Sequence, residues 1–258
     1  MAPPRRRPRA HFVAEVPAHG LAAVHSVAEV HGWWQGDAMQ LTHLGHSCLL
    51  VETDGTRILI DPGVFSHGFE ELSGLDAVVI THQHADHVDV ERLPVLLEAN
   101  DGAQLLVEPE TCADLRAAGI DATPLHAGAE VDVAGVPVRA VGGQHAVIHP
   151  DIPRVGNVGV LIGTSVADGG SGLLLHPGDS YGQTPSADVL ALPLWAPWSK
   201  VAEMVDFLRA VAPTIAVPIH ESQLLPAGRG MYLGHAERLA PEGTRVRDLA
   251  GEGPAELL

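Results

Sequence analysis

Short apolar segments, of the length expected for β-strands, recur along most of the chain. They cover residues 49–52, 57–60, 77–80, 105–107, 131–133, 136–141, 157–162, 173–175, 188–194 and 215–219. Asp54-Gly55 separates the first two segments, and this dipeptide between apolar runs is a strong signal for a β-hairpin turn. The pattern therefore predicts a protein rich in strands from about residue 41 onward.

Helical spacing of apolar residues occurs between several of these strands. The clearest case is 200–211, whose apolar positions share one helical face. Helices are also predicted over 88–100, 110–118 and 229–239; Asp86 or Asp89 is placed to cap the first, and Gly119 ends the second. Strands that alternate with helices indicate a layered α/β protein.

Composition and charge narrow the class of protein. Hydrophobic residues make up 46% of the 258 residues but aromatic residues only 4%, so the core is expected to be aliphatic. The formal net charge of −17 argues against general binding of nucleic acid, whose phosphates would be repelled. Two cysteines, Cys48 and Cys112, provide no disulfide framework, and we expect a cytoplasmic protein. No apolar run reaches 18 residues, so we expect no membrane span.

The first 38 residues differ from the rest of the chain. Arg5, Arg6, Arg7 and Arg9 lie among prolines, and no continuous apolar segment follows them, which is atypical of a secretory signal. We predict that residues 1–38 are an N-terminal extension, partly disordered or loosely docked, or result from a misassigned start, and that one functional domain covers residues 39–258.

A dense group of potential metal ligands follows the strand predicted at 77–80. Within six positions the chain places His82, His84, Asp86 and His87. Side chains two apart in an extended segment point the same way, so His82 and His84 can reach one ion. Asp86 and His87 are adjacent and diverge, so they can reach a second ion. Imidazole and carboxylate together suit a divalent ion such as zinc.

This His-x-His-x-Asp-His order resembles the signature of the metallo-β-lactamase superfamily. The resemblance implies an αββα sandwich, the metallo-β-lactamase fold, with two metal ions at one edge of the sheets. It extends from Met39 to about residue 250, because His145, Asp179 and His220 follow apolar segments in the order and at roughly the separations that the family shows. Each of the three would be weak evidence alone.

The resemblance also implies a role for each ligand. His82, His84 and His145 would hold the first metal, Asp86, His87 and His220 the second, and Asp179 would bridge both. A water between the ions would have its pKa lowered to about 7. Asp86 or Asp179 would orient the resulting hydroxide. Asp61 matches an aspartate that braces the turn beneath the site in this family.

Further side chains are candidates for the surroundings of the site. The segment Thr42–Ser47 resembles the Gly-His-Ser opening of a lactonase-like branch, in which His46 would approach the metals or substrate, or be a structural histidine. His176 is expected to hydrogen-bond a metal ligand. His149 would donate a proton to a leaving group, or be exposed without function. A substrate pocket that binds an anion could be lined by Trp195, Trp198 and Lys200. The alternative is that these side chains only pack in the fold and that Ser199 is the N-cap of a helix.

These observations favour a dinuclear metal-dependent hydrolase of a small-molecule ester, lactone, amide or phosphoester. The expected cofactors are two divalent ions, zinc first, with Mn²⁺ or Fe²⁺ as alternatives. Two other functions stay open on the same fold: an iron-dependent redox enzyme, and a non-catalytic metal-binding module. Substrate identity and the formation of a homo-oligomer are not determined by the sequence.

Overall fold

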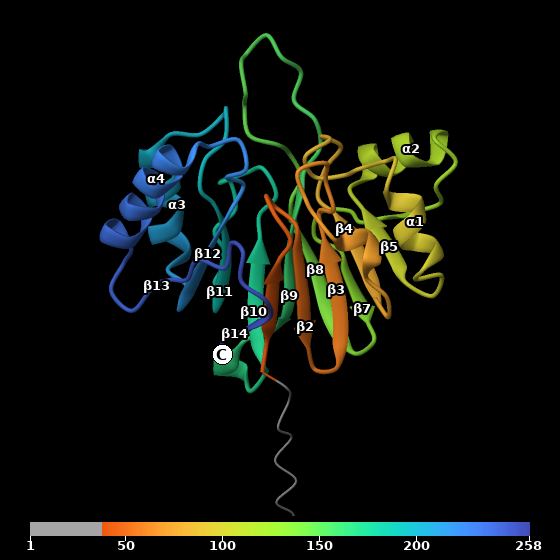
Figure 1. Cartoon of the computed structure of the whole chain (residues 1–258), viewed down its shortest axis with the longest axis horizontal. Coiled ribbons are helices and arrows are strands. Elements are labelled where there is room, and N and C mark those ends of the chain that lie inside the picture. Colours follow the sequence, from red (N-terminus) through yellow and green to blue (C-terminus); the bar gives the residue numbers. More distant parts are fainter. Residues whose placement is uncertain (1–37) are drawn as a thin grey trace, which may run out of the picture. The chain divides into compact units, whose positions relative to one another are not determined.

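The computed structural model describes residues 38–258 of the chain. The prediction of an N-terminal extension falls, apart from Ala38, outside the described residues and stays a prediction. The described part contains two seven-stranded mixed sheets, each with helices on its outer side (Figure 1).

The first sheet combines the early part of the chain with its last strand. Its order is β14-β1-β2-β3-β4-β5-β6, and its strands are β1 Gln40–His43, β2 Leu49–Thr53, β3 Thr56–Ile60, β4 Ala77–Ile80, β5 Gln104–Val107, β6 Thr123–Pro124 and β14 Ala255–Glu256. The second sheet has the order β13-β12-β11-β10-β9-β8-β7, and its strands are β7 Glu130–Val133, β8 Val136–Gly142, β9 Val158–Thr164, β10 Gly172–His176, β11 Val189–Pro193, β12 Ile215–Ile219 and β13 Arg245–Val246. The predicted hairpin is present, since Asp54 and Gly55 both have positive φ between β2 and β3.

Alternation along the strands sorts the apolar side chains into three layers. In β3, Ile58 and Ile60 enter the core between the two sheets, whereas Leu59 faces the helices. The helices are α1 Leu93–Glu98 and α2 Pro109–Ala117 on the first sheet, and α3 Val201–Val211 and α4 Pro226–Leu239 on the second. Two short 3₁₀ turns, Phe69–Glu71 and Val166–Asp168, complete the elements. The predicted αββα sandwich is confirmed.

Strand direction determines where the functional side chains gather. In the first sheet β1, β3 and β4 run the same way, because β2 is antiparallel to both of its neighbours and β4 is parallel to β3. In the second sheet β8, β10 and β12 likewise share one direction. Each of these six strands is followed within four residues by a histidine or aspartate of the predicted site or its surroundings. The carboxyl ends of the six strands therefore carry these side chains.

The first predicted helix is shorter in the structure than in the sequence analysis. Residues 90–92 form a turn, and α1 begins only at Leu93. The Asp89 carboxylate accepts the backbone N–H groups of Glu91 and Arg92 at 3.0 Å each, as an N-cap does, but the segment that it caps is the turn that precedes α1. The strands β1, β6, β13 and β14 were not predicted as separate strands, and three of them are only two residues long.

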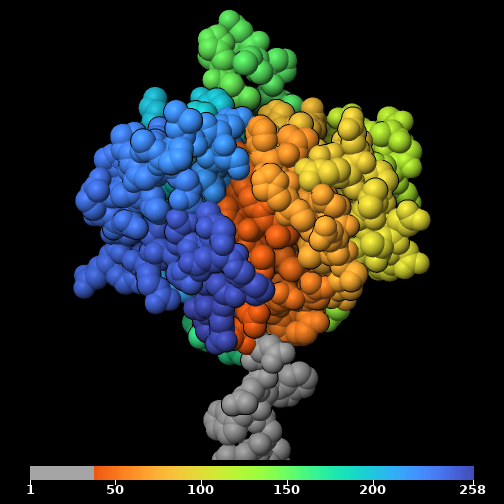
Figure 2. All heavy atoms as spheres, viewed as in Figure 1, coloured from red at the N-terminus to blue at the C-terminus, as the bar shows by residue number. Residues whose placement is uncertain are grey.

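The loop between β8 and β9, residues 143–157, projects beyond the ends of the strands (Figures 1 and 2). Its base is closed by hydrogen bonds from His145 N–H to the Val155 carbonyl and from Asn157 N–H to the Gly143 carbonyl. Within residues 38–258, no helix has the length and hydropathy needed to span a bilayer.

Candidate metal centre

The loop after β4 brings its ligand-type side chains together as predicted. Nε2 of His82 and Nδ1 of His84 lie 3.0 Å apart. His82 Nδ1–H donates to the Thr81 hydroxyl at 3.1 Å, and that hydroxyl donates to Asp61. His82 is therefore held from behind, and its Nε2 lone pair faces the centre of the cluster.

Three further imidazoles are oriented in the same manner. Nδ1–H of His87 donates to Asp61 at 2.6 Å, while those of His145 and His220 donate at 2.7 Å to the carbonyls of Ala146 and Trp195. Each bond fixes the tautomer that leaves the Nε2 lone pair free. These three Nε2 atoms are buried and have no hydrogen-bond partner among the described residues. Buried polar atoms are normally satisfied, so this set points to a missing ligand.

Asp61 braces the turn beneath the cluster, as the sequence predicted. Its carboxylate accepts the N–H of Thr81 at 2.8 Å, the hydroxyl of Thr81 at 2.7 Å and the N–H of His87. Asp61, His46 and His220 are three of the six non-glycine residues with positive φ in the described part of the chain. Strained backbone of this kind is concentrated at functional sites.

Asp179 lies between the two groups of imidazoles. Its Oδ1 is 3.1 Å from Nε2 of both His87 and His220, whereas its Oδ2 is 3.3 Å from Nε2 of His145 and 4.0 Å from that of His82. Each oxygen thus faces a different group, which is the arrangement required of a bridging carboxylate.

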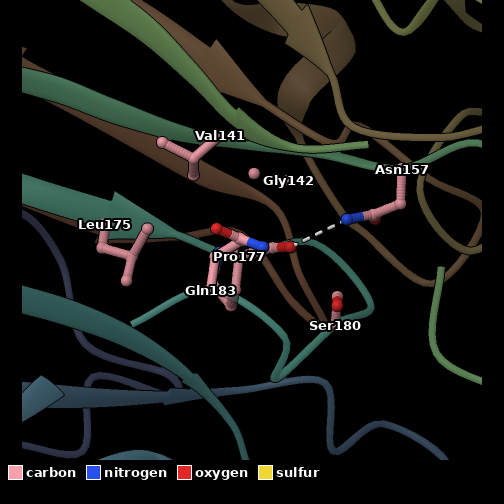
Figure 3. Close-up of a pocket in the computed structure, with 8 residues that line it drawn as sticks. Val141, Gly142, Asn157, Leu175, Pro177, Ser180 and Gln183 are labelled. Carbon is pink, nitrogen blue, oxygen red and sulfur yellow. Dashed lines mark hydrogen bonds between the residues drawn. The ribbon is translucent and has the colours of Figure 1, made fainter. Parts of the chain in front are cut away.

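The turn that carries Asp179 is fixed by Asn157. The Asn157 amide donates to the Pro177 carbonyl at 3.0 Å, next to a small pocket that Ser180 and Gln183 also line (Figure 3). Its Oδ1 accepts the Asp179 N–H at 2.9 Å. Gly178 has φ 57°, and a Cβ there would lie 2.3 Å from Asn157 Oδ1. Only glycine permits this close approach.

His46 joins the cluster through Asp86. Burial lowers the pKa of His46 to about 4, so its ring is neutral at pH 7. Nδ1 accepts the N–H of Ser222 at 3.4 Å, and Nε2–H donates to Asp86 Oδ2 at 3.1 Å. His46 follows the end of β1 in the Gly-His-Ser segment, which was the signal for it in the sequence; its contact with Asp86 was not predicted.

Two sets of ligand-type atoms result, each converging within 4.8 Å. One is formed by His82, His84, His145 and Asp179, and the other by His46, Asp86, His87 and His220. Burial opposes ionisation of Asp179, yet the imidazoles of His87 and His220 outweigh it and hold the pKa of this carboxyl well below its usual range. Burial also opposes protonation of His87, but Asp179 and Asp61 together raise its pKa well above the usual value.

These donors fit a pair of divalent cations. Neutral imidazoles and carboxylates are the ligands that such ions take, and the orphaned nitrogens are aimed where the ions would lie. A group of seven predicted ligands, drawn from four separate segments, is thus assembled at one edge of the sandwich: His82, His84, Asp86, His87, His145, Asp179 and His220.

Several candidates for the surroundings lie elsewhere than expected. His176 does not hydrogen-bond a ligand residue; it donates to the Ser47 carbonyl at 2.9 Å and accepts the Gly178 N–H at 3.2 Å, because its ring lies under the turn. His149 is exposed in the projecting loop, where its Nδ1 accepts the Asp151 N–H. The side chain of Lys200 is 81% exposed and pairs with Glu203 at the start of α3, so it does not reach the cluster.

The two tryptophans contribute in different ways. Trp195 contributes its backbone carbonyl, which orients His220. Trp198 directs its indole N–H to Asp179 Oδ2 at 2.8 Å. Ser199 is not the N-cap of α3, because its hydroxyl bonds with the backbone of Ala196 and Lys200 takes the capping position.

Paired sheets covered by helices, with a buried His/Asp cluster at the shared edge, define a metal-binding protein of the αββα class. The sequence pattern of the beta-lactamase superfamily domain matches residues 40–220. The chain belongs to the metallo-β-lactamase superfamily.

Similar proteins agree with this assignment. Protein Rv0786c of Mycobacterium tuberculosis is 53% identical over 197 residues, which cover 76% of this chain and 90% of that protein. A UPF0173 metal-dependent hydrolase of Aeropyrum pernix is 30% identical over 205 residues, covering 70% and 81% respectively. The structure of Igni18, a metallo hydrolase from Ignicoccus hospitalis, has a TM-score of 0.62 at 23% identity and covers 85% of this chain and 99% of that one, which shows the shared fold.

Proposed function

We propose that this metal-dependent hydrolase is dinuclear and cleaves a small-molecule ester, lactone, amide or phosphoester. The observation that carries the proposal is Asp179, whose two oxygens face two separate sets of converging imidazoles. His82, His84 and His145 would hold one cation, Asp86, His87 and His220 the other, and Asp179 would contact both. Zinc is the ion that this ligand set favours, with Mn²⁺ or Fe²⁺ as alternatives.

When bound, two such cations supply Lewis acidity and a water whose pKa is lowered to about 7. Asp86 and Asp179 differ in solvent exposure, and this difference suggests different roles for them. The Asp86 side chain is 22% exposed and Asp179 only 5%, so Asp86 is the carboxylate that can reach water or substrate. His46 restrains Asp86 through Oδ2 and keeps it in one orientation. We therefore assign Asp86 to orienting the attacking water and Asp179 to joining the two halves of the centre.

The net reaction is the addition of water across the scissile bond. The acyl or phosphoryl group takes the hydroxyl, and the leaving oxygen or nitrogen takes the proton. The formal charge of −17 supports a small-molecule substrate over a nucleic acid.

The proposal is tested with a panel of esters, lactones and phosphodiesters and with elemental analysis. Two metal ions per chain are expected, and His84→Ala and Asp179→Asn should each abolish turnover while the circular dichroism spectrum stays native. His126→Ala, which changes an exposed histidine outside the cluster, is the matched control. Retention of most activity by either ligand variant contradicts the dinuclear mechanism. A fully metallated protein without turnover on any substrate indicates a binding module. Bound iron together with redox turnover in place of hydrolysis supports the redox alternative.

We also propose that the functional domain begins near Met39. Met39 is fully buried between the sheets, and its carbonyl accepts the Leu257 N–H at 3.0 Å. Removal of residues 1–38 should leave metal content and melting temperature unchanged, and a loss of either contradicts this boundary.

A further inference from the structure

The indole of Trp198 contacts the carboxylate that the two sets of imidazoles share. Its Nε1–H donates to Asp179 Oδ2 at 2.8 Å. The ring centroid lies 6.1 Å from that of His145 and 6.4 Å from that of His220, one from each set. Trp198 is therefore next to the centre of the cluster, on the loop that joins β11 to α3.

The orientation of this indole is set by residues outside the cluster. The Tyr181 ring packs edge-on against Trp198 with centroids 4.9 Å apart, and stacks on Phe207 of α3 at 4.8 Å. The Tyr181 hydroxyl donates to the Pro193 carbonyl at 2.7 Å. An aromatic series thus runs from α3 to Asp179 and fixes the direction of the indole N–H.

The two oxygens of Asp179 have different environments as a result. Oδ2 accepts the indole N–H, whereas Oδ1 is buried without a hydrogen-bond partner among the described residues. Oδ1 also lies closest to Nε2 of His87 and of His220. The two oxygens of an ionised carboxylate are equivalent, so the N–H of Trp198 fixes the plane of the Asp179 carboxylate and keeps the second oxygen directed at His87 and His220.

We propose that Trp198 is a positioning residue, which holds Asp179 by Oδ2 and thereby presents Oδ1 to the cation that His87 and His220 would hold. The proposal rests on the metal centre described under Proposed function but not on its hydrolytic chemistry. Groups that hydrogen-bond a metal-ligating carboxylate orient it, and their removal typically lowers metal affinity by about 10- to 100-fold. A purely packing role for Trp198 would instead be preserved by any aromatic ring of similar size.

Two single substitutions separate the roles. Trp198→Phe keeps an aromatic ring against Tyr181 and removes the N–H. Tyr232→Phe on α4 is the matched control, because it also removes one polar hydrogen from an aromatic side chain, and Tyr232 packs against the apolar residues between the second sheet and its helices rather than on the cluster. Zinc affinity is measured by titrating each metal-free protein in competition with a chromophoric chelator. We expect about 10-fold weaker zinc binding for Trp198→Phe and an affinity within about two-fold of wild type for Tyr232→Phe.

A second readout is independent of the substitutions. The chain has four tryptophans, so ¹⁵N-labelled protein gives four indole N–H signals. The Trp198 signal, assigned through its Overhauser contacts with Tyr181, should exchange slowly with solvent in metal-free protein and shift when zinc is added. This measurement decides the question even where Trp198→Phe does not fold.

Wild-type zinc affinity in a folded Trp198→Phe protein overturns the proposal, as does an indole proton that exchanges as fast as one exposed to water. A wild-type protein that binds zinc tightly, shows the expected loss in Trp198→Phe and hydrolyses nothing supports Trp198 as a positioning residue while rejecting the proposed hydrolysis.

Discussion

Asp61 Oδ2 lies 2.6 Å from Nδ1 of His87, and both side chains are completely buried. The same carboxylate accepts two hydrogen bonds from Thr81, so one aspartate joins the end of β3 to the loop that carries four of the expected ligands. Because Asp61 contacts His87 on the side away from the cluster, it orients the ligand without occupying a coordination position.

Substitution of this brace should weaken metal binding. In Asp61→Asn one oxygen becomes an N–H donor, which cannot accept from His87 or from the Thr81 hydroxyl. We expect zinc affinity to fall by about 10- to 100-fold, measured by chelator competition.

Asp188→Asn is the control for this substitution. Asp188 also accepts three hydrogen bonds, from Ser165 Oγ and from the N–H groups of Val166 and Leu173, but at a distance from the cluster. It should lower the melting temperature without changing zinc affinity. Equal effects of the two variants on affinity would show that Asp61 acts only through general stability.

Gly178→Ala should destabilise the protein and displace Asp179. The added Cβ would lie 2.3 Å from Asn157 Oδ1 and 2.9 Å from Thr81 Cβ, and the backbone φ is 57°. Steric overlap of this kind costs about 1–3 kcal/mol, and a left-handed conformation adds about 1 kcal/mol. Urea denaturation measures the free energy of unfolding. Gly230→Ala in α4, where nothing lies within 4 Å of the new Cβ, should be neutral or stabilising by up to about 1 kcal/mol. A wild-type midpoint for Gly178→Ala would show that the turn relaxes.

Removal of metal should lower the melting temperature. The cluster contains three orphaned imidazole nitrogens and one orphaned carboxylate oxygen that cations would satisfy. An ion that binds only the folded chain stabilises it by mass action. Melting is followed before and after chelation, with metal content verified at each step. The His84→Ala variant should lose most of this difference, and an unchanged melting temperature in wild-type protein after complete removal contradicts the coupling.

The Arg229–Asp248 pair should make the free energy of unfolding depend on pH in the acidic range. Two hydrogen bonds of 2.8 and 2.7 Å from the Arg229 guanidinium lower the pKa of Asp248. A carboxyl with a depressed pKa stabilises the fold above its unfolded pKa of about 3.9, and this contribution is lost as pH falls through the folded value. The pair is partly exposed, so its contribution is at most about 1 kcal/mol.

Asp248→Asn should therefore be less stable than wild type at pH 7, and the difference should close as the pH falls below about 3.9. Asp121→Asn is the control, since Asp121 is fully exposed and pairs with Arg116 at 3.6 Å. No change is expected there. If the difference in stability between Asp248→Asn and wild type persists at low pH, the effect of Asp248 comes from its packing and hydrogen-bond geometry rather than from its charge.

The convergence of the candidate metal ligands could be predicted because each follows an apolar strand, and the strand ends meet at one edge. His145 and His220 illustrate what could not be predicted. Their rings are oriented by the backbone carbonyls of Ala146 and Trp195. Every residue has such a carbonyl, so the sequence does not indicate which carbonyls accept these hydrogen bonds. The start of α1 was predicted too early, because Asp89 caps a turn at residues 90–92 that precedes the helix. The strand β14 pairs with β1 from the far end of the chain, and no local pattern indicates such a partner.

The division of the ligands between the sheets has a consequence for fragments of this chain. His82, His84, Asp86 and His87 follow a strand of the first sheet, whereas His145, Asp179 and His220 follow strands of the second. A polypeptide cut between β6 and β7 would leave each piece with an incomplete set. The two pieces would then bind zinc tightly only after they reassociate, so zinc affinity would measure their association.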